Sequence, residues 1–489
     1  MRTIPHFINK HAIKLLYALT LGMGVIIFFT LENGHVIGGD FAQYIEQSEA
    51  ILSGHTADLL ESNTYAMDHS DRNIGPYLYP VGFPLLITPV TWLFGVNFIA
   101  YKTLMLFFFL LVCITSFYLF RTCFDEPLWP LIIALSILFN YYFMVSLDLI
   151  GSDIPYLFFA LMSLYLIKKQ RRSNKWLHQL GIGMIISFAF LLRTSGVSIL
   201  FTLGFIHFYE DIKLFAGDPG SYLRGNYRRF LPYIVFIIAI ILDGTFYYSG
   251  EQNHIRLLQN ASVSQAIDNL IHYATEFKLF LILYYPEISV LFLILSTPFL
   301  AIGIIRNLKH NLLFLVFIAA NFGIYAIWPE QERVRFLFPV LPFYFYFLVK
   351  GILIVSASAP RFKLHLLPYF LLLGIMIQGL FYSFRDFHQD NSSNVLSPAS
   401  TEVFNFITTK TDPSALFIFT KPRTLRLMTG RNAIAQSETS GMLNSEASFV
   451  LKFRDPMLEI NGFELIFSNK DFELYRINPS LNPQPVFPE

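Results

Sequence analysis

The chain has 489 residues, of which 54% are hydrophobic, 17% aromatic and only 14% charged. Soluble domains carry roughly 25% charged residues, so this composition excludes an ordinary soluble protein. The formal net charge of +1 gives no bulk electrostatic attraction for nucleic acid. Apolar runs of about 17 to 25 residues recur along the chain, and a helix of that length crosses roughly 30 Å of hydrocarbon. We therefore expect a polytopic membrane protein.

Eleven apolar runs are predicted to be transmembrane helices, because an open sheet edge is not stable in lipid. The first run follows Arg2 and Lys10 and lacks a small-x-small cleavage site, which favours an uncleaved anchor over a signal peptide. The runs lie at about residues 12–31, 100–120, 128–146, 152–167, 178–192, 195–209, 230–248, 286–305, 312–328, 336–356 and 365–383.

Basic residues indicate the orientation, because they gather in cytoplasmic loops. With a cytoplasmic N-terminus, the basic cluster at 168–175 lies inside and the loop from Glu32 to Ala100 lies outside. The segment Phe83–Ile99 is also apolar, but counting it as a span would place the basic cluster outside. It contains two prolines and a glycine, so we expect helices at the outer interface. The outside loop has one basic residue, Arg72, and eight acidic ones: Glu32, Asp40, Glu46, Glu49, Asp58, Glu61, Asp68 and Asp71.

The C-terminal part, from about 385 to 489, has ordinary polarity and no span. By parity it lies outside, and its length suits one small α/β domain after a transmembrane catalytic domain at 1–384. A helix is predicted at Pro398–Thr409, with Ser397 or Ser400 as its cap, and a strand at 415–420. Two alternating segments, 463–468 and 472–477, flank Asn469-Lys470 and predict a hairpin.

Two carboxylates are candidates for chemistry. Asp40, in Gly38–Tyr44, follows the first span and stays near the membrane surface, where a carboxylate can act as a general base or bind a cation. Asp153, in Gly151–Pro155, lies on a short outside loop. The alternative for both is a helix start, since Asp favours the first turn. Their shared side and depth favour one outer cavity.

Arginines outside the membrane form a second group of candidates. Arg333 and Arg335 lie in Trp328–Phe336, on an outside loop where the positive-inside rule disfavours them. Arginine suits bidentate contacts to phosphate, although a local ion pair with Glu330 or Glu332 is an alternative. Arg193, at the end of a span, is a functional candidate or a snorkelling side chain. Three histidines share the acidic loop without metal-ligand spacing: His35, His55 and His69.

Five motifs stand in a fixed order over about residues 10–350: Gly39-Asp40 with Tyr44, the Tyr- and Pro-rich Pro76–Leu86, Ser152-Asp153-Ile154-Pro155, Leu192–Gly196 and Arg333–Pro339. In this order they resemble the polytopic glycosyltransferases of the GT-C fold, in particular the protein mannosyltransferase and aminoarabinose transferase branch. The chain departs from that pattern in its lone Asp40, where many members pair acidic residues. It also has Asp153 where many relatives carry glutamate.

The resemblance implies an all-α membrane fold of about 11 transmembrane helices, GT-C-like, with a small α/β extracytoplasmic C-terminal domain. It implies inverting transfer of a hexosyl or pentosyl group from a polyprenyl-phosphate donor to a glycan, lipid or protein acceptor. We expect this in the cell envelope, at a bacterial inner membrane. A transporter or flippase, or a polymerase of lipid-linked glycans, is the alternative; the acidic residues cluster outside, unlike the midplane sites of transporters.

The resemblance also implies roles for the candidates. Asp40 would be the general base, and Asp153 would be the second catalytic carboxylate, orienting a substrate or sharing a divalent cation with Asp40. No cofactor is required by the sequence, and the divalent cation stays open. The residues expected to bind substrate or its phosphate are Tyr44, Arg193, Glu330, Arg333 and Arg335.

Overall fold

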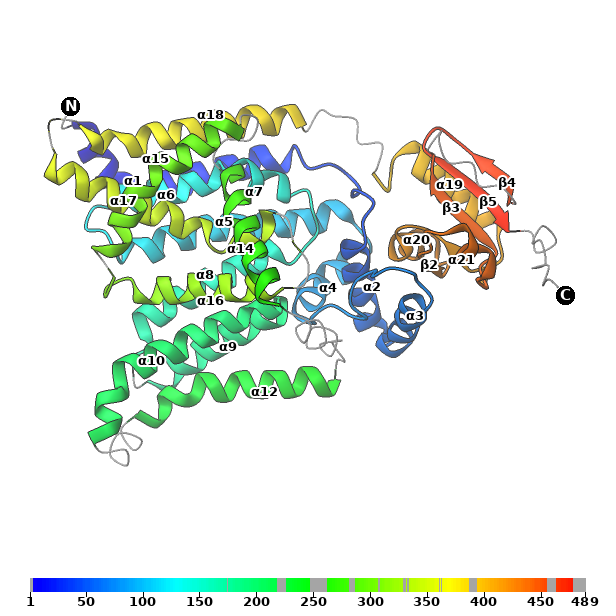
Figure 1. Cartoon of the computed structure of the whole chain (residues 1–489), viewed down its shortest axis with the longest axis horizontal. Coiled ribbons are helices and arrows are strands. Elements are labelled where there is room, and N and C mark those ends of the chain that lie inside the picture. Colours follow the sequence, from blue (N-terminus) through cyan, green and yellow to red (C-terminus); the bar gives the residue numbers. More distant parts are fainter. Residues whose placement is uncertain are drawn as a thin grey trace.

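The computed structural model describes residues 3–173, 175–217, 226–246, 262–280, 286–306, 308–328, 331, 334–359, 361, 363–386, 394–454 and 463–477. Glu330 and Arg333, both predicted site residues, lie outside the described residues. The described part is mostly helical, with a small sheet near the C-terminus (Figure 1).

The long helices lie alongside one another as a bundle (Figure 1). They coincide with the predicted apolar runs, because their length and apolar surface follow from the same residues. Five described stretches are long and apolar enough to cross a membrane: Asn9–Phe28, Phe98–Arg121, Glu287–Ile305, Leu341–Ser358 and Leu364–Phe381. The bundle helices are α1 (Thr3–Phe28), α5 (Phe98–Arg121), α6 (Leu128–Leu138), α7 (Tyr141–Ser146), α8 (Asp153–Gln170), α9 (Trp176–Leu192), α10 (Val197–Gly217), α12 (Leu231–Phe246), α15 (Pro286–Ile305), α16 (Leu312–Ile327), α17 (Leu341–Ser358) and α18 (Leu367–Asp386).

Two predicted runs are interrupted. The run 128–146 consists of α6 and α7, separated at Asn140, whose side chain accepts a hydrogen bond from the Tyr142 amide at 3.2 Å and donates to the Phe280 carbonyl at 2.9 Å. Asparagine competes in this way with the helical backbone, and the break follows. The run 336–356 begins as the 3₁₀ turn η4 (Val334–Leu337), and α17 starts only at Leu341.

Short helices form a layer at one end of the bundle. Figure 1 shows α2 (Asp40–Ser53), α3 (Thr56–Asp68) and α4 (Gly82–Phe94) between the bundle and the C-terminal sheet. Gly82 packs against α9, since a Cβ there would come within 2.5 Å of the Leu191 backbone. The 13 residues of α4 are too few to cross the bilayer, in agreement with the predicted interfacial segment.

The C-terminal domain, residues 394–477, has a five-stranded sheet in the order β2-β1-β3-β5-β4. β1 (Phe417–Ile418) pairs in parallel with β2 (Ala433–Ile434) and β3 (Phe449–Phe453), whereas β5 (Phe472–Ile477) is antiparallel to β3 and to β4 (Phe463–Ser468). The predicted hairpin and helix are confirmed, and Ser397 caps the helix by accepting from the Ser400 amide at 3.2 Å. The remaining described elements are α14 (Val263–Glu276), α19 (Pro398–Lys410), α20 (Pro422–Thr429), α21 (Thr439–Asn444), η1 (Thr194–Gly196), η2 (Tyr227–Phe230), η3 (Phe277–Phe280) and η6 (Leu364–Leu366).

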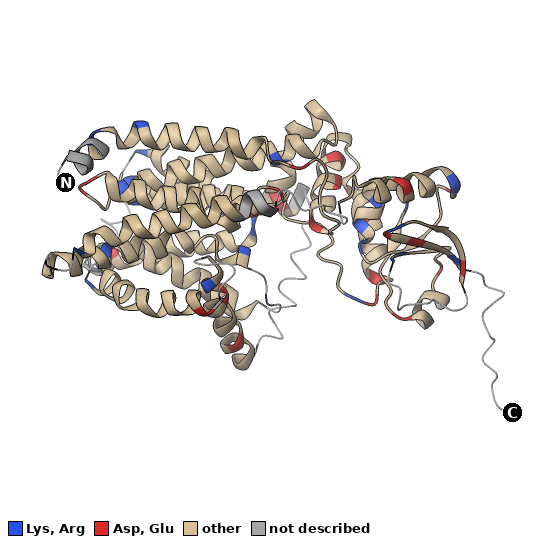
Figure 2. Ribbon diagram, turned by 90° about the horizontal axis from the view of Figure 1, so that it is seen from above, with Lys and Arg blue, Asp and Glu red and all other residues tan. Residues whose placement is uncertain are grey.

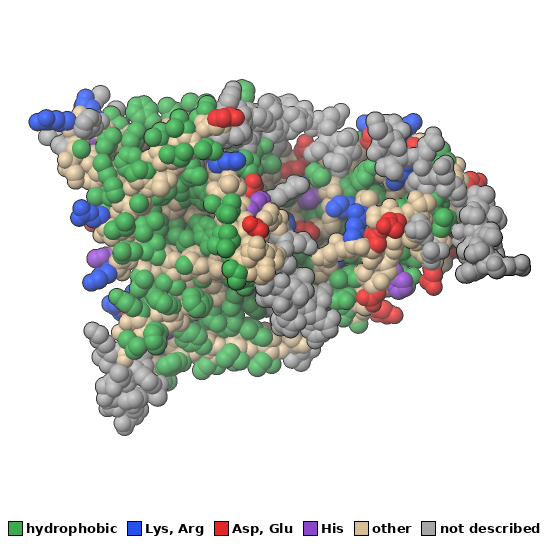
Figure 3. Space-filling model, viewed as in Figure 1, with side chains coloured by type: hydrophobic (Ala, Val, Ile, Leu, Met, Phe, Trp, Pro, Cys, Tyr) green, Lys and Arg blue, Asp and Glu red, His purple; other side chains and the backbone are tan. Residues whose placement is uncertain are grey.

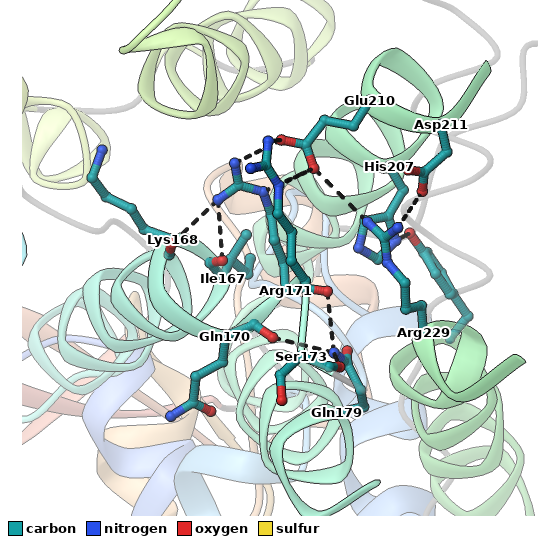
Figure 4. A network of polar contacts seen from close by, with 12 residues as sticks. Ile167, Lys168, Gln170, Arg171, Ser173, Gln179, His207, Glu210, Asp211 and Arg229 are labelled. Carbon is teal, nitrogen blue, oxygen red and sulfur yellow. Dashed lines mark hydrogen bonds and ion pairs between the residues drawn. The ribbon is translucent and has the colours of Figure 1, made fainter. Parts of the chain in front are cut away.

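Charge is arranged along the long axis of the molecule. Figure 3 shows hydrophobic side chains over the face of the bundle, and Figure 2 shows charged residues gathered toward its ends and on the C-terminal domain. One charged network, drawn in Figure 4, is built from Arg171 after α8, Glu210 and Asp211 on α10, and Arg229 in η2. Since α8 has 18 residues at about 1.5 Å each, this network lies about 27 Å from the end of α8 that holds Asp153.

Candidate active site

Asp40 is the first residue of α2, directly after Gly39 as N-cap. The predicted helix start is therefore present, with Asp40 as the acidic residue of its first turn, and it does not account for the partners of the carboxylate. The carboxylate accepts a hydrogen bond from the Tyr79 hydroxyl at 2.7 Å and pairs with Arg335 at 3.4 Å. Its side chain is 48% exposed, so one side remains open to a substrate.

The surroundings of Asp40 favour its ionised form. Burial acts to raise the pKa of this carboxyl, but the Arg335 charge, the Tyr79 hydrogen bond and the more distant Arg423 charge outweigh it and hold the pKa below its usual range. Asp40 is therefore an acceptor of protons and hydrogen bonds at neutral pH.

Asp153 opens α8 and forms an ion pair with Arg193. Arg193 directly follows α9 in an extended conformation (φ −151°, ψ 133°), and its guanidinium lies 5.0 Å from the centre of the Phe336 ring. This departure from the helix is what directs the arginine toward α8. Arg193 therefore has a specific carboxylate partner on a neighbouring helix.

A small hollow lies beside this pair, with a lining that combines two arginines, one carboxylate and several hydroxyl groups: Asp153, Tyr156, Arg193, Ser195, Tyr325, Arg335, Phe336 and Pro339. Arg335 both lines the hollow and contacts Asp40, which begins a different helix. The structure thus brings together four predicted residues, Asp40, Asp153, Arg193 and Arg335. Such a lining suits an anionic, hydroxyl-bearing ligand.

Tyr44 connects the segment that carries Asp40 to the segment that carries Asp153. It is buried, its hydroxyl lies 3.3 Å from the Ser152 hydroxyl, and its ring centre lies 4.5 Å from that of Tyr79 and 4.6 Å from that of Phe83. Burial and the nearby Asp40 charge raise the pKa of its hydroxyl, which stays neutral. These contacts suit a support for the site; the predicted contact of Tyr44 with substrate stays a prediction.

Two buried contacts fasten the segment before Asp40 to the segment before Asp153. Lys102, fully buried, donates to the Asp148 carboxylate at 2.7 Å and to the Glu32 carbonyl at 2.8 Å. His35 accepts from the Ile150 amide at 3.1 Å through Nε2, so its Nδ1 carries the proton and donates to the Val36 carbonyl at 2.7 Å. Burial lowers the pKa of His35 to about 4, which keeps the ring neutral.

Sequence reasoning missed the roles of several side chains. Tyr79 stands within the quoted segment Pro76–Leu86, but no pattern singled it out as a partner of Asp40. Tyr156 and Tyr325 look like ordinary aromatic residues of apolar spans. Arg423 comes from the C-terminal domain, whose sequence gave no sign of a contribution to this site.

The donor set that the described residues offer at this site does not suit a divalent cation. Among the described residues no three His, Cys, Asp or Glu side chains are grouped as metal ligands. Asp40 is paired with Arg335 and Asp153 with Arg193, so each carboxylate faces a cation that would repel a metal ion.

Comparisons with known proteins bear on the fold. No family model matches the chain, and no curated protein matches its sequence. Among solved structures, ArnT from Cupriavidus metallidurans in the apo state is similar with a TM-score of 0.57 and 13% identity, covering 97% of this chain and 99% of that one. The same protein bound to undecaprenyl phosphate gives a TM-score of 0.56 with 13% identity, covering 96% and 99%.

A second solved protein is also similar. The Archaeoglobus fulgidus oligosaccharyltransferase tethered with an acceptor peptide gives a TM-score of 0.58 and 10% identity, covering 92% of this chain and 70% of that one. Identities this low establish shared architecture, and both proteins are GT-C glycosyltransferases. The predicted architecture is confirmed: this chain is a multi-pass membrane protein with the GT-C fold, while the number of its spans and its orientation stay predictions.

Proposed function

We propose that the chain is an inverting membrane glycosyltransferase that moves a sugar from a polyprenyl-phosphate donor to an acceptor hydroxyl on the extracytoplasmic side. The observation that supports this most directly is Arg335, which contacts Asp40 and also lines the hollow with Arg193 and Asp153. A base and a phosphate-binding group therefore stand side by side, as a displacement at a sugar-phosphate bond requires. Solved proteins of this fold are known in complex with undecaprenyl phosphate and with dolichol phosphate.

In the proposed reaction, the acceptor hydroxyl gives its proton to Asp40 while its oxygen bonds to the anomeric carbon. The bond from that carbon to the phosphate oxygen breaks, and its electron pair stays on the phosphate. Arg335 and Arg193 stabilise the developing negative charge. Attack opposite the leaving phosphate inverts the configuration at the anomeric carbon. Asp153 keeps Arg193 in place through their ion pair.

Arg335 would also couple donor binding to the strength of the base. A phosphate in the hollow competes with Asp40 for the same guanidinium, which lies only 3.4 Å from the carboxylate. When Arg335 turns to the phosphate, Asp40 loses the nearby cation that lowers its pKa most, and that pKa rises. Asp40 is then a better proton acceptor only once the donor is bound. The acceptor hydroxyl would then be deprotonated only when a donor is present to react with it.

The orientation belongs to the same proposal. Basic residues occupy the network at the far end of α8, and by the positive-inside rule that end is cytoplasmic. The acidic end, the hollow and the C-terminal domain then face the outside. We propose that transfer needs no metal, since both carboxylates already face arginines. Addition of a chelator should leave turnover unchanged, and loss of turnover restored by a divalent cation would contradict this.

The decisive experiment measures sugar transfer from a polyprenyl-phosphate donor in membranes. Asp40→Asn keeps the shape of the side chain but removes the base, and turnover should fall by about 10²- to 10⁴-fold. Asp58→Asn is the matched control, because Asp58 is an exposed acidic residue of the same outside loop. Undiminished turnover of Asp40→Asn at normal protein level would exclude Asp40 as the base.

A further inference from the structure

The C-terminal domain reaches the candidate active site through α20. Arg426 makes a two-pronged ion pair with Glu46 on α2, with both N–O distances 2.7 Å, and donates to the Asn63 side chain at 2.6 Å. The Thr424 hydroxyl donates to the Gly38 carbonyl, two residues before Asp40. These contacts fasten the domain to the beginning of α2.

Arg423 lies one turn from Arg426 and contacts the segment that carries Tyr79, the hydrogen-bond partner of Asp40. The side chain is 2% exposed, its Nη2 donates to the Pro76 carbonyl, and its guanidinium lies 5.9 Å from the centre of the Tyr79 ring. Gly75 makes this approach feasible: its φ is +107°, and a Cβ there would lie 2.7 Å from Nη1 of Arg423. Arg423 is therefore seated against the segment that carries Tyr79.

The hydrogen bonding of Arg423 is less complete than that of Arg426 and Arg431, although Nε of Arg431 is also buried without a partner. Both Nε and Nη1 of Arg423 are buried without a hydrogen-bond partner. Arg426 has a carboxylate for its charge, and Arg431 of the same domain donates to the carbonyls of Thr408, Thr411 and Thr429. Arg426 and Thr424 already hold the domain against α2, so docking of the domain does not require Arg423. Burying the Arg423 guanidinium with unsatisfied N–H groups costs free energy. Groups of this kind concentrate at functional sites.

The groups that face Asp40 come from several elements. Arg335 of η4 and Tyr79, before α4, contact it directly. Arg423 from α20 lowers the pKa of Asp40 through its charge, and the Asp40 charge in turn raises the pKa of Tyr44 on the same helix and acts to raise that of His35 before it. Among these, Arg423 is the one supplied by the C-terminal domain. It contacts the ring of Tyr79, whose hydroxyl donates to Asp40.

We propose that Arg423 is a positioning residue for Asp40: it holds Tyr79 and the segment from Gly75 to Pro80 so that the Tyr79 hydroxyl points at the carboxylate. Its positive charge also favours the ionised carboxylate. The C-terminal domain is then part of the catalytic apparatus. The catalytic consequence rests on the proposed function, but the contact with Asp40 can be tested without it.

The test measures the protonation of Asp40 directly. The full-length protein in membranes or detergent is labelled with a carbodiimide and an amine between pH 3 and pH 7, and modification of Asp40 is quantified by mass spectrometry. Arg423→Met removes the charge and keeps much of the volume. Arg431→Met is the matched control, because Arg431 is also a buried arginine of this domain but bonds only within it. Arg423→Lys restores the charge.

We expect the midpoint of Asp40 labelling in Arg423→Met to rise by about half a pH unit or more, with partial return in Arg423→Lys and no rise in Arg431→Met. Gly75→Ala should raise it too, since the new Cβ displaces the guanidinium, and this variant serves if Arg423→Met does not accumulate. In the transfer assay, kcat should fall about tenfold in Arg423→Met, because the Tyr79 hydroxyl is no longer held toward Asp40 and this loss outweighs the gain in basicity from the higher pKa; the donor KM should change little.

A midpoint in Arg423→Met equal to that of Arg431→Met would overturn the proposal. An equal rise in both variants would also overturn it, since that result indicates loosening of the whole domain. Labelling does not depend on sugar transfer. A wild-type protein that transfers no sugar would therefore refute the proposed function while the labelling midpoints still decide the position of Arg423.

Discussion

Two clusters of arginines and carboxylates lie at opposite ends of the bundle, and they differ in how open they are. In the network of Figure 4, Arg171 and Arg172 converge on Glu210, and Arg229 pairs with Asp211. The Glu210 and Asp211 side chains are only 14% and 10% exposed. At the other end, Asp40 and Arg335 are 48% and 39% exposed and adjoin a hollow.

The comparison shows that ion pairs alone do not identify a functional site. The network gives Glu210 three arginine partners, Arg171, Arg172 and Arg229, and ties α8, α10 and η2 together, which is a structural task. The Asp40 cluster leaves each carboxylate with one arginine and leaves room beside it. Replacements in the first cluster should therefore alter stability, and those in the second should alter turnover.

The largest effect is expected for Arg335→Met. This change removes a group proposed to hold the phosphate, so turnover should fall by about 10²- to 10³-fold with little change in melting temperature. Arg335→Lys should restore only part of the loss, since lysine lacks the planar fork of arginine. Transfer assays and thermal melts of the same preparations measure both quantities. A large fall in melting temperature with normal turnover would show that Arg335 has a structural role and no role in the reaction.

The second effect concerns Glu210→Gln. This variant leaves Arg171 and Arg172 without their shared carboxylate, and stability should fall by about 3 kcal/mol. Turnover per folded molecule should match the wild type. Thermal melting and transfer, normalised to folded protein, provide the measurement. Lost turnover in fully folded protein would show that the network takes part in the reaction.

The third prediction concerns pH and the contact that fastens the Asp40 segment. The pKa of His35 is about 4, below its ordinary value of 6.5, so an unfolded chain binds a proton in this interval and the folded one does not. Stability should be complete above pH 6.5 and should be lost as the pH falls toward 4, by at most about 3 kcal/mol. Melting temperature against pH gives the measurement. His35→Gln should flatten this dependence of melting temperature on pH. An unchanged dependence in the variant would show that other groups cause it.

The smallest effect is expected for Arg172→Ala. Although Arg172 contacts Glu210 at 2.7 Å, its side chain is 74% exposed, and exposed pairs contribute about 1 kcal/mol or less. Its melting temperature should stay within about a degree of the wild type, whereas Arg171→Ala, with a side chain 18% exposed, should melt lower. Equal losses in both variants would show that exposure is a poor guide within the network.

The sequence by itself determined the helices of the bundle, the interfacial segment and the hairpin of the C-terminal domain. Those features follow from apolar length, proline placement and alternation, which neighbouring residues set together. It also singled out Asp40, Asp153, Arg193 and Arg335 as candidates, because charges beside apolar spans are rare. The break at Asn140 was missed, since its partner Phe280 lies 140 residues away.

Only the tertiary structure decided which candidates meet. Arg335 reaches Asp40 across 295 residues of sequence, and Arg423 reaches the Pro76 segment across 347. Arg193 faces Asp153 because the chain leaves the helical conformation after α9. The C-terminal domain adjoins Tyr79 because Gly75 leaves space for the Arg423 guanidinium. Contacts of this range depend on how whole helices pack, and no local pattern in the chain encodes them.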